Sequence, residues 1–255
     1  MSALVSIITP SYNVAKFIAE TIQSVQNQTY QNWEMIIVDD NSSDETVSIV
    51  TKYILNDSRI CLYQLQKNCG AGVARNKAIE MAQGNFIAFL DADDLWKPEK
   101  LEKQLRFMQE QNIPFTYSFY EIINENGVLQ NKTLTTPAQI TYKQLYYCNW
   151  IGNLTAIYHV DALGKIAIAS IKKRQDWILW LQILKKIKTA TPLCESLAYY
   201  RVRNDSLSAS KWRLLKFNFK IYREFHKRNI LFASYDMLFF LFVQLLIKPK
   251  YKITQ

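Results

Sequence analysis

The chain has 255 residues, of which 49% are hydrophobic, and only six glycines and six prolines, a composition that excludes a disordered or low-complexity protein. Its four cysteines form no C-x-x-C pair and have no zinc-site spacing, so we expect reduced thiols in a cytosolic protein. The net charge of +9 is concentrated at one end, because residues 211–255 hold ten of the 31 Lys and Arg but only two of the 22 Asp and Glu.

The first half of the chain alternates strand and helix patterns. Short apolar runs predict four buried strands, at residues 4–9, 34–39, 59–65 and 86–91. Apolar residues at helical spacing predict a helix after each strand, over about 18–25, 46–55, from Gly72 onward, and from Lys97-Pro98 onward. This order predicts an α/β fold, in which a parallel sheet is covered by helices on both faces.

Polar clusters follow three of these strands. They read "TPSYN" (9–13), "DDNSSD" (39–44) and "DADD" (91–94). Ligands bind at the carboxyl ends of the strands in such sheets, so the three clusters predict one site at this edge. A G-x-G-x-x-G sequence after the first strand and a P-loop are both missing, which argues against dinucleotide binding and P-loop chemistry.

The third cluster places Asp91, Asp93 and Asp94 within four residues. Crowded carboxylates repel one another unless a cation lies among them, and oxygen ligands without nearby Cys or His suit Mg²⁺ or Mn²⁺. The alternative is that Asp93 and Asp94 only cap the following turn. The neighbouring polar clusters favour the metal.

Two further stretches are suited to binding a ligand. Asp39 and Asp40 end the second strand, where a carboxylate can accept hydrogen bonds from a ligand, whereas we expect Asp44 to be the N-cap of the next helix. "NCGAGVARNKA" (68–78) predicts a glycine turn followed by Arg75 in the first turns of a helix, an arrangement that suits a phosphate.

Together these stretches resemble the family 2 glycosyltransferases of GT-A fold. The matching features are "TPSYN", "VDDNSSD", N-x-G-x-x-x-A-R-N at 68–76, "DADD" and "QDWILWL" (175–181). The resemblance covers about residues 4–100 and 175–210. It implies a Rossmann-like, mostly parallel sheet flanked by helices, and transfer of a sugar from a nucleotide-sugar with inversion at the anomeric carbon.

The resemblance also implies a donor site. Pro10, Tyr12 and Asp40 would form the pocket for the nucleotide base, with Tyr12 stacking on the ring and Asp40 accepting from the N–H of uracil. Asn13 and Asp39 are further candidates for donor contacts.

The diphosphate would lie nearby. Arg75 would order the nucleotide, and Asp91 would approach the ribose or the metal-bound water. Asp93 would coordinate the Mn²⁺ or Mg²⁺ that bridges the diphosphate, with Asp94 supporting it. Arg201 or Arg203 could close over the diphosphate from the segment 199–210, or either could be a surface arginine.

On the acceptor side, Asp176 is the candidate catalytic base, since an acceptor hydroxyl is too weak an acid to ionise at neutral pH. The alternative is a helix N-terminal charge favoured by the helix dipole. Gln175 stands where the family often has Glu, which puts a second carboxylate contact in doubt. Among the aromatic residues of the second half, Trp150 and Trp177 are candidates for acceptor contacts.

The last segment combines charge and apolar residues. Basic residues recur at spacings of three and four on a predicted helix, at Arg213, Lys216, Lys220, Arg223 and Lys227. "MLFFLFVQLLI" (237–247) follows, and eleven residues are too short to cross a bilayer about 30 Å thick. The basic helix and the apolar run together suit a segment lying on an anionic membrane. The alternative is a helix packed on the main domain or in a homodimer. Nothing besides charge favours nucleic acid.

The sequence therefore predicts a catalytic domain at 1–210, with a nucleotide-sugar half (1–112) and an acceptor half (113–210), and a basic amphipathic extension at 211–255. We expect a metal-dependent inverting glycosyltransferase that takes its sugar from a nucleotide-sugar. UDP is the favoured nucleotide of this donor, and GDP and dTDP are the alternatives. The acceptor would be a hydroxyl of a lipid-linked or cell-envelope glycan, such as lipopolysaccharide or capsule. The Q-x-x-R-W signature of processive polysaccharide synthases is missing. We therefore expect one sugar to be added per acceptor.

We expect this enzyme in the cytoplasm, peripheral on the inner face of the cytoplasmic membrane, because no basic segment precedes the first apolar run as a secretory signal would require. Two alternatives stay open. "FLDADDL" superficially resembles the D-x-D-x-[TV] motif of haloacid-dehalogenase-type phosphatases, although Leu95 replaces the Thr or Val. The other alternative is a catalytically inactive, membrane-associated glycan-binding protein.

Overall fold

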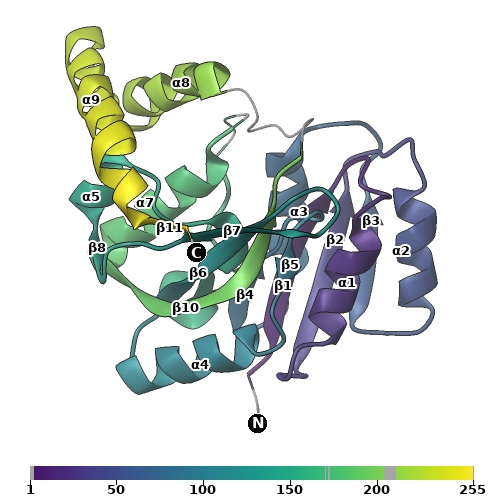
Figure 1. Ribbon diagram of the computed structural model, residues 1–255. Helices are drawn as coiled ribbons and strands as arrows, with labels where there is room; N and C mark the ends of the chain where they lie inside the picture. The colour runs from purple at the N-terminus through teal and green to yellow at the C-terminus, as the bar shows by residue number, and fades with distance from the viewer. Residues whose placement is uncertain (1–2, 170, 172, 204–210, 255) are drawn as a thin grey trace.

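The computed structural model describes residues 3–169, 171, 173–203 and 211–254 (Figure 1). The main strands are β1 (Val5–Ser11), β2 (Trp33–Asp39), β3 (Ile60–Gln64), β4 (Phe86–Phe89), β6 (Phe115–Ile123), β7 (Leu129–Leu134), β9 (Ile157–His159) and β10 (Thr189–Arg201), with short strands β5 (Leu95–Trp96), β8 (Ile140–Thr141) and β11 (Lys252–Thr254). The helices are α1 (Ile18–Gln26), α2 (Thr46–Ile54), α3 (Ala71–Met81), α4 (Lys100–Gln111), α5 (Tyr142–Tyr147), α6 (Val160–Leu163), α7 (Gln175–Ile187), α8 (Lys211–Lys220) and α9 (Ile230–Phe242).

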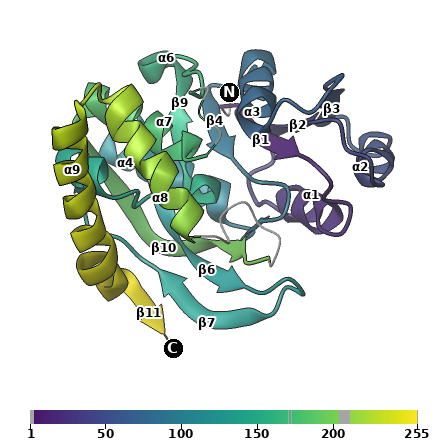
Figure 2. The same cartoon turned by 90° about the horizontal axis from the view of Figure 1, so that it is seen from above.

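The first half folds as the sequence predicts. Strands β3, β2, β1 and β4 lie side by side and are parallel. Their side chains alternate between two cores: Ile7 joins the cluster beneath α1 and α2, whereas Ile8 joins the cluster beneath α3. Figure 2 shows α1 and α2 on one face of these strands and α3 on the other. The carboxyl ends of β1, β2 and β4 therefore meet at one edge.

The second half has a mixed sheet. The strand β9 lies between β4 and β6 and is antiparallel to both. The strand β6 then pairs antiparallel with β7 and parallel with β10, giving the order β11-β7-β6-β9-β4-β1-β2-β3. Parallel pairing therefore occurs among the first four strands and again between β6 and β10, with the antiparallel strand β9 between these two parts of the sheet.

Helix α7 is almost entirely buried, because it carries apolar side chains on nearly all of its sides. Trp180 packs against the rings of Phe89 and Phe115, each with its centroid 5.5 Å away. This packing fixes the first turn of α7, which carries Asp176, at the same edge of the sheet. Arg174, at the N-cap, has a left-handed backbone with φ of 66°.

The C-terminal segment lies against the main body. Helix α8 continues through a π-helical turn (Ile221–Phe225), and α9 continues through further helical turns (Val243–Ile247 and Lys248–Tyr251) to β11, which pairs with β7 at the edge of the sheet (Figure 1). The predicted basic residues Lys216, Lys220, Arg223 and Lys227 are exposed.

One side of α9 and of its continuation through Val243–Ile247 is buried. The other side exposes large apolar side chains, which we call the apolar row of α9: Leu231, Phe232, Tyr235, Leu238, Phe239, Phe242, Leu245 and Leu246. The helical run Ile230–Tyr251 has 22 residues and is long and apolar enough to cross a membrane by length and composition. The sequence predicted that the apolar run 237–247 is too short to cross a bilayer. This prediction is corrected, because the helix begins seven residues before that run.

Candidate active site

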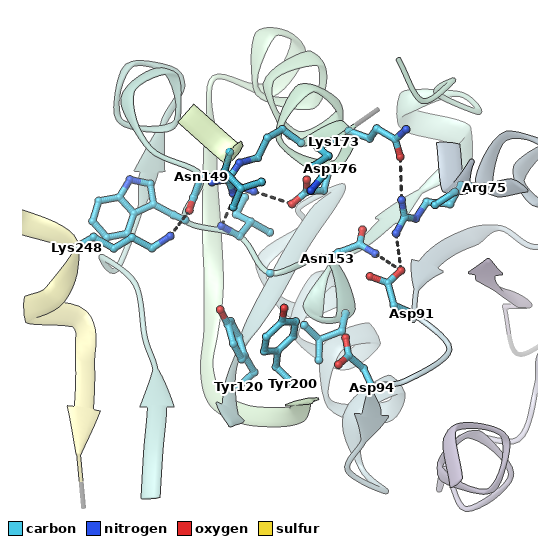
Figure 3. Close-up of a pocket in the computed structure, with 18 residues that line it drawn as sticks. Arg75, Asp91, Asp94, Tyr120, Asn149, Asn153, Lys173, Asp176, Tyr200 and Lys248 are labelled. Carbon is cyan, nitrogen blue, oxygen red and sulfur yellow. Dashed lines mark hydrogen bonds and ion pairs between the residues drawn. The ribbon is translucent and has the colours of Figure 1, made fainter. Parts of the chain in front are cut away.

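Two adjoining cavities lie at the carboxyl ends of β1, β2 and β4. The larger has a volume of about 570 Å³ and the smaller, shown in Figure 3, about 310 Å³. Arg75, Asp91 and Asp94 line both. The two cavities are therefore continuous around an arginine and two carboxylates.

The larger cavity gathers most of the residues predicted to bind the donor. They come from five separate stretches of the chain: Pro10, Tyr12, Asn13, Asp40, Arg75, Asp91, Asp93, Asp94, Arg201 and Arg203. The ring of Tyr12 is 49% exposed, so it is accessible for stacking. Within the segment 199–210, residues 204–210 lie outside the part of the chain that the structure describes.

Asp39 has a different position from the one predicted. It is buried and does not line either cavity. Its carboxylate accepts from Ser11 Oγ over 3.0 Å and from the backbone N–H of Ser42 over 2.8 Å. Asp39 thus holds the loop after β2, and its predicted substrate contact is corrected to a structural one.

Asp40 is also nearly buried but lines the larger cavity. It accepts from the backbone N–H groups of Cys69 and Gly70 over 2.6 and 2.7 Å. Gly70 has φ of 89°, which favours glycine and allows the chain to turn directly into α3. These bonds bring the N-terminus of α3, and with it Arg75, to the end of β2.

The acidic cluster is tied to cations. Arg75 donates to Asp91 over 2.6 Å, and Arg203 donates to Asp93 over 3.0 Å. Asp94 accepts from the backbone N–H of Arg201 over 2.9 Å. Each carboxylate therefore already has a donor, so the cluster is more than a set of turn caps.

Burial, followed by the charge of Asp91, raises the pKa of Asp93 above its usual value. Burial and the charges of Asp93 and Asp91 likewise raise the pKa of Asp94 well above its usual value. A cation that binds here would relieve this repulsion, and carboxylate oxygens are the ligands that Mn²⁺ and Mg²⁺ prefer. Among the described residues no group of three or more acidic, His or Cys side chains is placed to hold a metal, so diphosphate oxygens and water would have to complete its coordination.

Neither Arg201, at the end of β10, nor Arg203, just after it, is a surface residue. Arg201 is 2% exposed, and its guanidinium donates to the carbonyls of Asp93 and Glu125 and to Glu20. Arg201 therefore holds the loop after β4 in place. The guanidinium of Arg203 lies against Asp93 and the ring of Phe17, where it faces the cavity.

Asp176 lines the smaller cavity together with residues from the C-terminal segment. Asn149 Nδ2 donates to Asp176 Oδ2 over 2.7 Å, and Lys248 Nζ donates to the backbone carbonyl of Asn149 over 2.6 Å (Figure 3). Tyr120 and Tyr200 pack edge to face and form another part of the wall. The position of Asp176 thus depends on a segment far away in the sequence.

Gln175 links this helix to the acidic cluster. Its Oε1 accepts from Arg75 over 3.0 Å, and its Nε2 donates to the carbonyl of Ile171 over 2.7 Å. A Cβ at Gly72 would lie 2.2 Å from Nε2, so an alanine there would force the amide of Gln175 to move. Gln175 therefore takes up the space beside Arg75 at the junction of the cavities.

The two tryptophan candidates differ. Trp150 is 7% exposed and lines the smaller cavity, although its indole N–H donates to the carbonyl of Gln144. Trp177 is fully buried, donates to the carbonyl of Leu145 and packs against Phe240. The predicted acceptor contact of Trp177 is wrong because its side chain belongs to the core.

Sequence reasoning missed several residues of the smaller cavity: Asn149, Asn153, Lys173, Arg174 and Lys248. Asn153 donates to Asp91 over 3.0 Å. The two asparagines flank Trp150 in a stretch without a repeating pattern, and Lys248 had been assigned only to the basic extension. The proximity of Asn149 and Asn153 to Trp150 was the only available signal.

Comparison with known proteins identifies the family. The model of "Glycosyl transferase family 2" matches residues 6–167. A Bacillus subtilis glycosyltransferase assigned to teichuronic acid biosynthesis is 43% identical over 91% of this chain and 92% of its own length. An Escherichia coli enzyme named UDP-Glc:alpha-D-GlcNAc-diphosphoundecaprenol beta-1,3-glucosyltransferase is 40% identical over 87% of this chain and 86% of its own length.

Solved structures show the same fold. Staphylococcus aureus TarS in complex with UDP-GlcNAc superposes with a TM-score of 0.70 at 22% identity, over 94% of this chain and 73% of that protein's chain. A Pyrobaculum calidifontis mannosyltransferase in complex with GDP-Man and Mn²⁺ gives 0.69 at 16% identity, over 95% and 70% of the two chains. The chain therefore belongs to glycosyltransferase family 2 and has the GT-A fold.

Proposed function

We propose that this protein transfers one sugar from a UDP-sugar to a hydroxyl of a lipid-linked glycan of the cell envelope, with inversion and with the help of Mn²⁺ or Mg²⁺. The observation that carries the proposal is the junction of the two cavities at Arg75, Asp91 and Asp94. A donor in the larger cavity would place its anomeric carbon near this junction, and an acceptor in the smaller cavity would meet it beside Asp176.

The larger cavity supports the donor assignment. Tyr12 offers a ring for stacking on a base, and Arg75 and Arg203 offer guanidinium groups for phosphate oxygens. UDP is favoured because the named Escherichia coli relative uses UDP-Glc and TarS binds UDP-GlcNAc. The same relative acts on a diphosphoundecaprenol-linked sugar, which supports a lipid-linked acceptor here.

The metal would be held by Asp93, with Asp94 supporting it, and when bound it would stabilise the negative charge of the departing diphosphate. Asp176 would accept the proton of the attacking hydroxyl through its carboxylate, while the oxygen of that hydroxyl bonds to the anomeric carbon and the bond from this carbon to the phosphate oxygen breaks. Arg75 and Gln175 keep the two sides of the site in register through their mutual hydrogen bond.

Family membership overturns the phosphatase alternative. In the structure the Asp cluster follows the fourth strand, β4, and its carboxylates face a cavity shared with the residues after β1. The glycan-binding alternative would have the same fold and predicts binding without turnover. Turnover therefore separates it from the proposed enzyme.

The C-terminal segment supports a site of action at the membrane. The exposed apolar row on α9 and the basic residues Lys216, Lys220, Arg223 and Lys227 are the two features that an anionic bilayer surface attracts. We propose that the protein works in the cytoplasm, on the inner face of the cytoplasmic membrane. The alternative is a homodimer in which a second copy of the chain covers the same apolar row.

The donor is tested by isothermal titration of UDP, GDP and dTDP in Mn²⁺ and in EDTA. We expect UDP to bind in Mn²⁺, and to bind at least tenfold more weakly in EDTA or to Asp93→Ala. The proposal fails at the donor if no nucleotide binds under any condition.

Turnover is tested with UDP-sugars and a lipid extract as acceptor. We expect Asp176→Asn to retain UDP affinity and to lose about a hundredfold or more of the rate. Asp161→Asn is the matched control, since Asp161 is exposed on α6 and outside both cavities. A wild-type protein that binds UDP but gives no turnover with any UDP-sugar would favour the glycan-binding alternative.

A further inference from the structure

The smaller cavity carries more positive charge than the transfer reaction accounts for. Of its cations, Arg75 is paired with Asp91. Three others line the wall around the catalytic candidate: Lys173, Arg174 and Lys248. Asp176 is the acidic residue on this part of the wall. Figure 3 shows Lys173 and Lys248 on the same side of the cavity as Asp176, away from Asp91 and Asp94.

These cations are held in position by the fold. Lys248 Nζ donates to the carbonyl of Asn149, and an ammonium group has two further N–H donors. Arg174 Nε donates to Asn218 on α8 over 2.9 Å. Lys173 Nζ lies 5.8 Å from the ring centre of Phe217, also on α8. Helix α8 thus contacts Lys173 and Arg174, and Asn149 holds Lys248.

The backbone of Arg174 is strained. Its φ of 66° is rare for a residue other than glycine, and such strain is often found at functional sites. The residue directly precedes α7, so the left-handed turn sets both the guanidinium and Asp176 at the cavity.

The helical run that exposes the apolar row also carries one of the three cations, Lys248. Leu245 and Leu246 are 66% and 59% exposed, and the helical run passes from them into Lys248, which enters the cavity. A ligand that joins a long apolar chain to a strongly anionic group would contact both surfaces at once.

We propose that Lys173, Arg174 and Lys248 bind the diphosphate of a lipid-linked acceptor, while its hydrocarbon chain runs along the exposed row of α9. This proposal rests on the proposed function, whose acceptor it specifies. It explains why the extension contributes a side chain to the site that holds the base. The sugar attached to the diphosphate would then extend toward Asp176.

The test uses a defined probe in place of the unidentified acceptor. Farnesyl diphosphate and farnesol, each in detergent micelles, are titrated into the full-length protein in EDTA with excess UDP, so that no metal holds the diphosphate at Asp93. We expect the diphosphate to bind at least tenfold more tightly than the alcohol. Lys173→Met and Lys248→Met should each reduce this preference about tenfold, because each removes a charge-assisted hydrogen bond.

Lys250→Met is the matched control. Lys250 is exposed two residues beyond Lys248 and does not line the cavity, so its loss should leave the preference unchanged. Lys248 donates to the backbone carbonyl of Asn149, so Lys248→Met could also act indirectly by moving Asn149. Lys173→Met tests the cavity from a different element, just before α7. UDP affinity in Mn²⁺, measured on every variant, verifies that the donor side is intact.

Equal binding of diphosphate and alcohol, or an unchanged preference in both variants, would overturn the proposal. A loss of binding to phosphatidylglycerol vesicles without a change toward farnesyl diphosphate would also overturn it and assign the cations to bilayer headgroups. If UDP does not bind to the wild type, the proposed donor fails by itself, while the diphosphate preference still decides the acceptor site.

Discussion

The side-chain amide of Asn149 donates to Asp176, and the backbone carbonyl of the same Asn149 accepts from Lys248. One residue therefore connects the candidate base to the helical run that exposes its apolar side chains. Docking of this run therefore helps to hold Asn149, and through it Asp176, in place. This connection makes Asn149 a positioning residue and leads to the first prediction.

Asn149→Ala should lower kcat about ten- to a hundredfold, because a misplaced base is costly even when it is chemically intact. The Kd for UDP should not change, since Asn149 does not line the larger cavity. Asn126→Ala, in an exposed loop, is the control. A kcat within twofold of the wild type would show that Asp176 does not depend on this hydrogen bond.

The second prediction concerns the buried acidic cluster and pH. The pKa of Asp94 is raised in the folded protein, first by burial and then by its acidic neighbours, so the folded state binds more protons than the unfolded state above the usual aspartate range. Stability from this residue is therefore largest at low pH and is lost as pH rises through the raised pKa.

In EDTA, Asp94→Asn should raise the Tm relative to the wild type, and the difference should grow from pH 5 to pH 8. The asparagine oxygen can still accept from the N–H of Arg201. Mn²⁺ should raise the Tm of the wild type more than that of the variant. Thermal unfolding across this pH range measures both, and a difference that shrinks with rising pH would contradict the argument.

Much of the larger cavity could be predicted from sequence because it follows from local rules. Polar clusters directly after buried parallel strands must lie at one edge of the sheet, which brought Tyr12, Asp40 and Asp93 together. Asp39 shows the limit of this rule, because successive residues at a strand end point to different sides and only Asp40 faces the cavity.

The smaller cavity depends on contacts between distant segments. Asn149 and Lys248 are 99 residues apart, and no spacing rule relates them. The error at Trp177 has a local cause: neighbours on a helix point about 100° apart, so Trp177 faces the core when Asp176 faces the cavity. The eleven-residue count failed because the helix includes the less apolar turn before Met237.

The third prediction separates the two arginines after the acidic cluster. Arg201→Met should destabilise the protein by about 3 kcal/mol, because the part-buried carbonyls of Asp93 and Glu125 would lose the guanidinium as a donor. Arg203→Met should cost less stability than Arg201→Met, since the ion pair of Arg203 with Asp93 is partly exposed, but should weaken UDP binding about tenfold. Urea unfolding and UDP titration give the two numbers for each variant. The reverse pattern would show that Arg201 is the nucleotide ligand.

The last prediction concerns the membrane. Leu238 and Leu245 are 67% and 66% exposed on the apolar row of α9. Replacing either with Asp should reduce binding to anionic vesicles about tenfold or more, because burying one leucine is worth about 2 kcal/mol and a carboxylate is repelled by the surface. Leu55→Asp, which changes a leucine 80% exposed beyond α2, should have no effect in vesicle flotation.

A carbonate wash then distinguishes the two ways in which the 22-residue run Ile230–Tyr251 can meet the bilayer. Release by the wash is expected, because Lys248 and β11 are tied to the main body and the run is therefore held along the surface. Retention would mean that these contacts break and the helix spans the bilayer. In that case Lys248 would leave Asn149, and the orientation of Asp176 would need another explanation. Vesicle binding that none of the α9 substitutions reduces would instead assign the exposed row to a homodimer, which sedimentation equilibrium would detect.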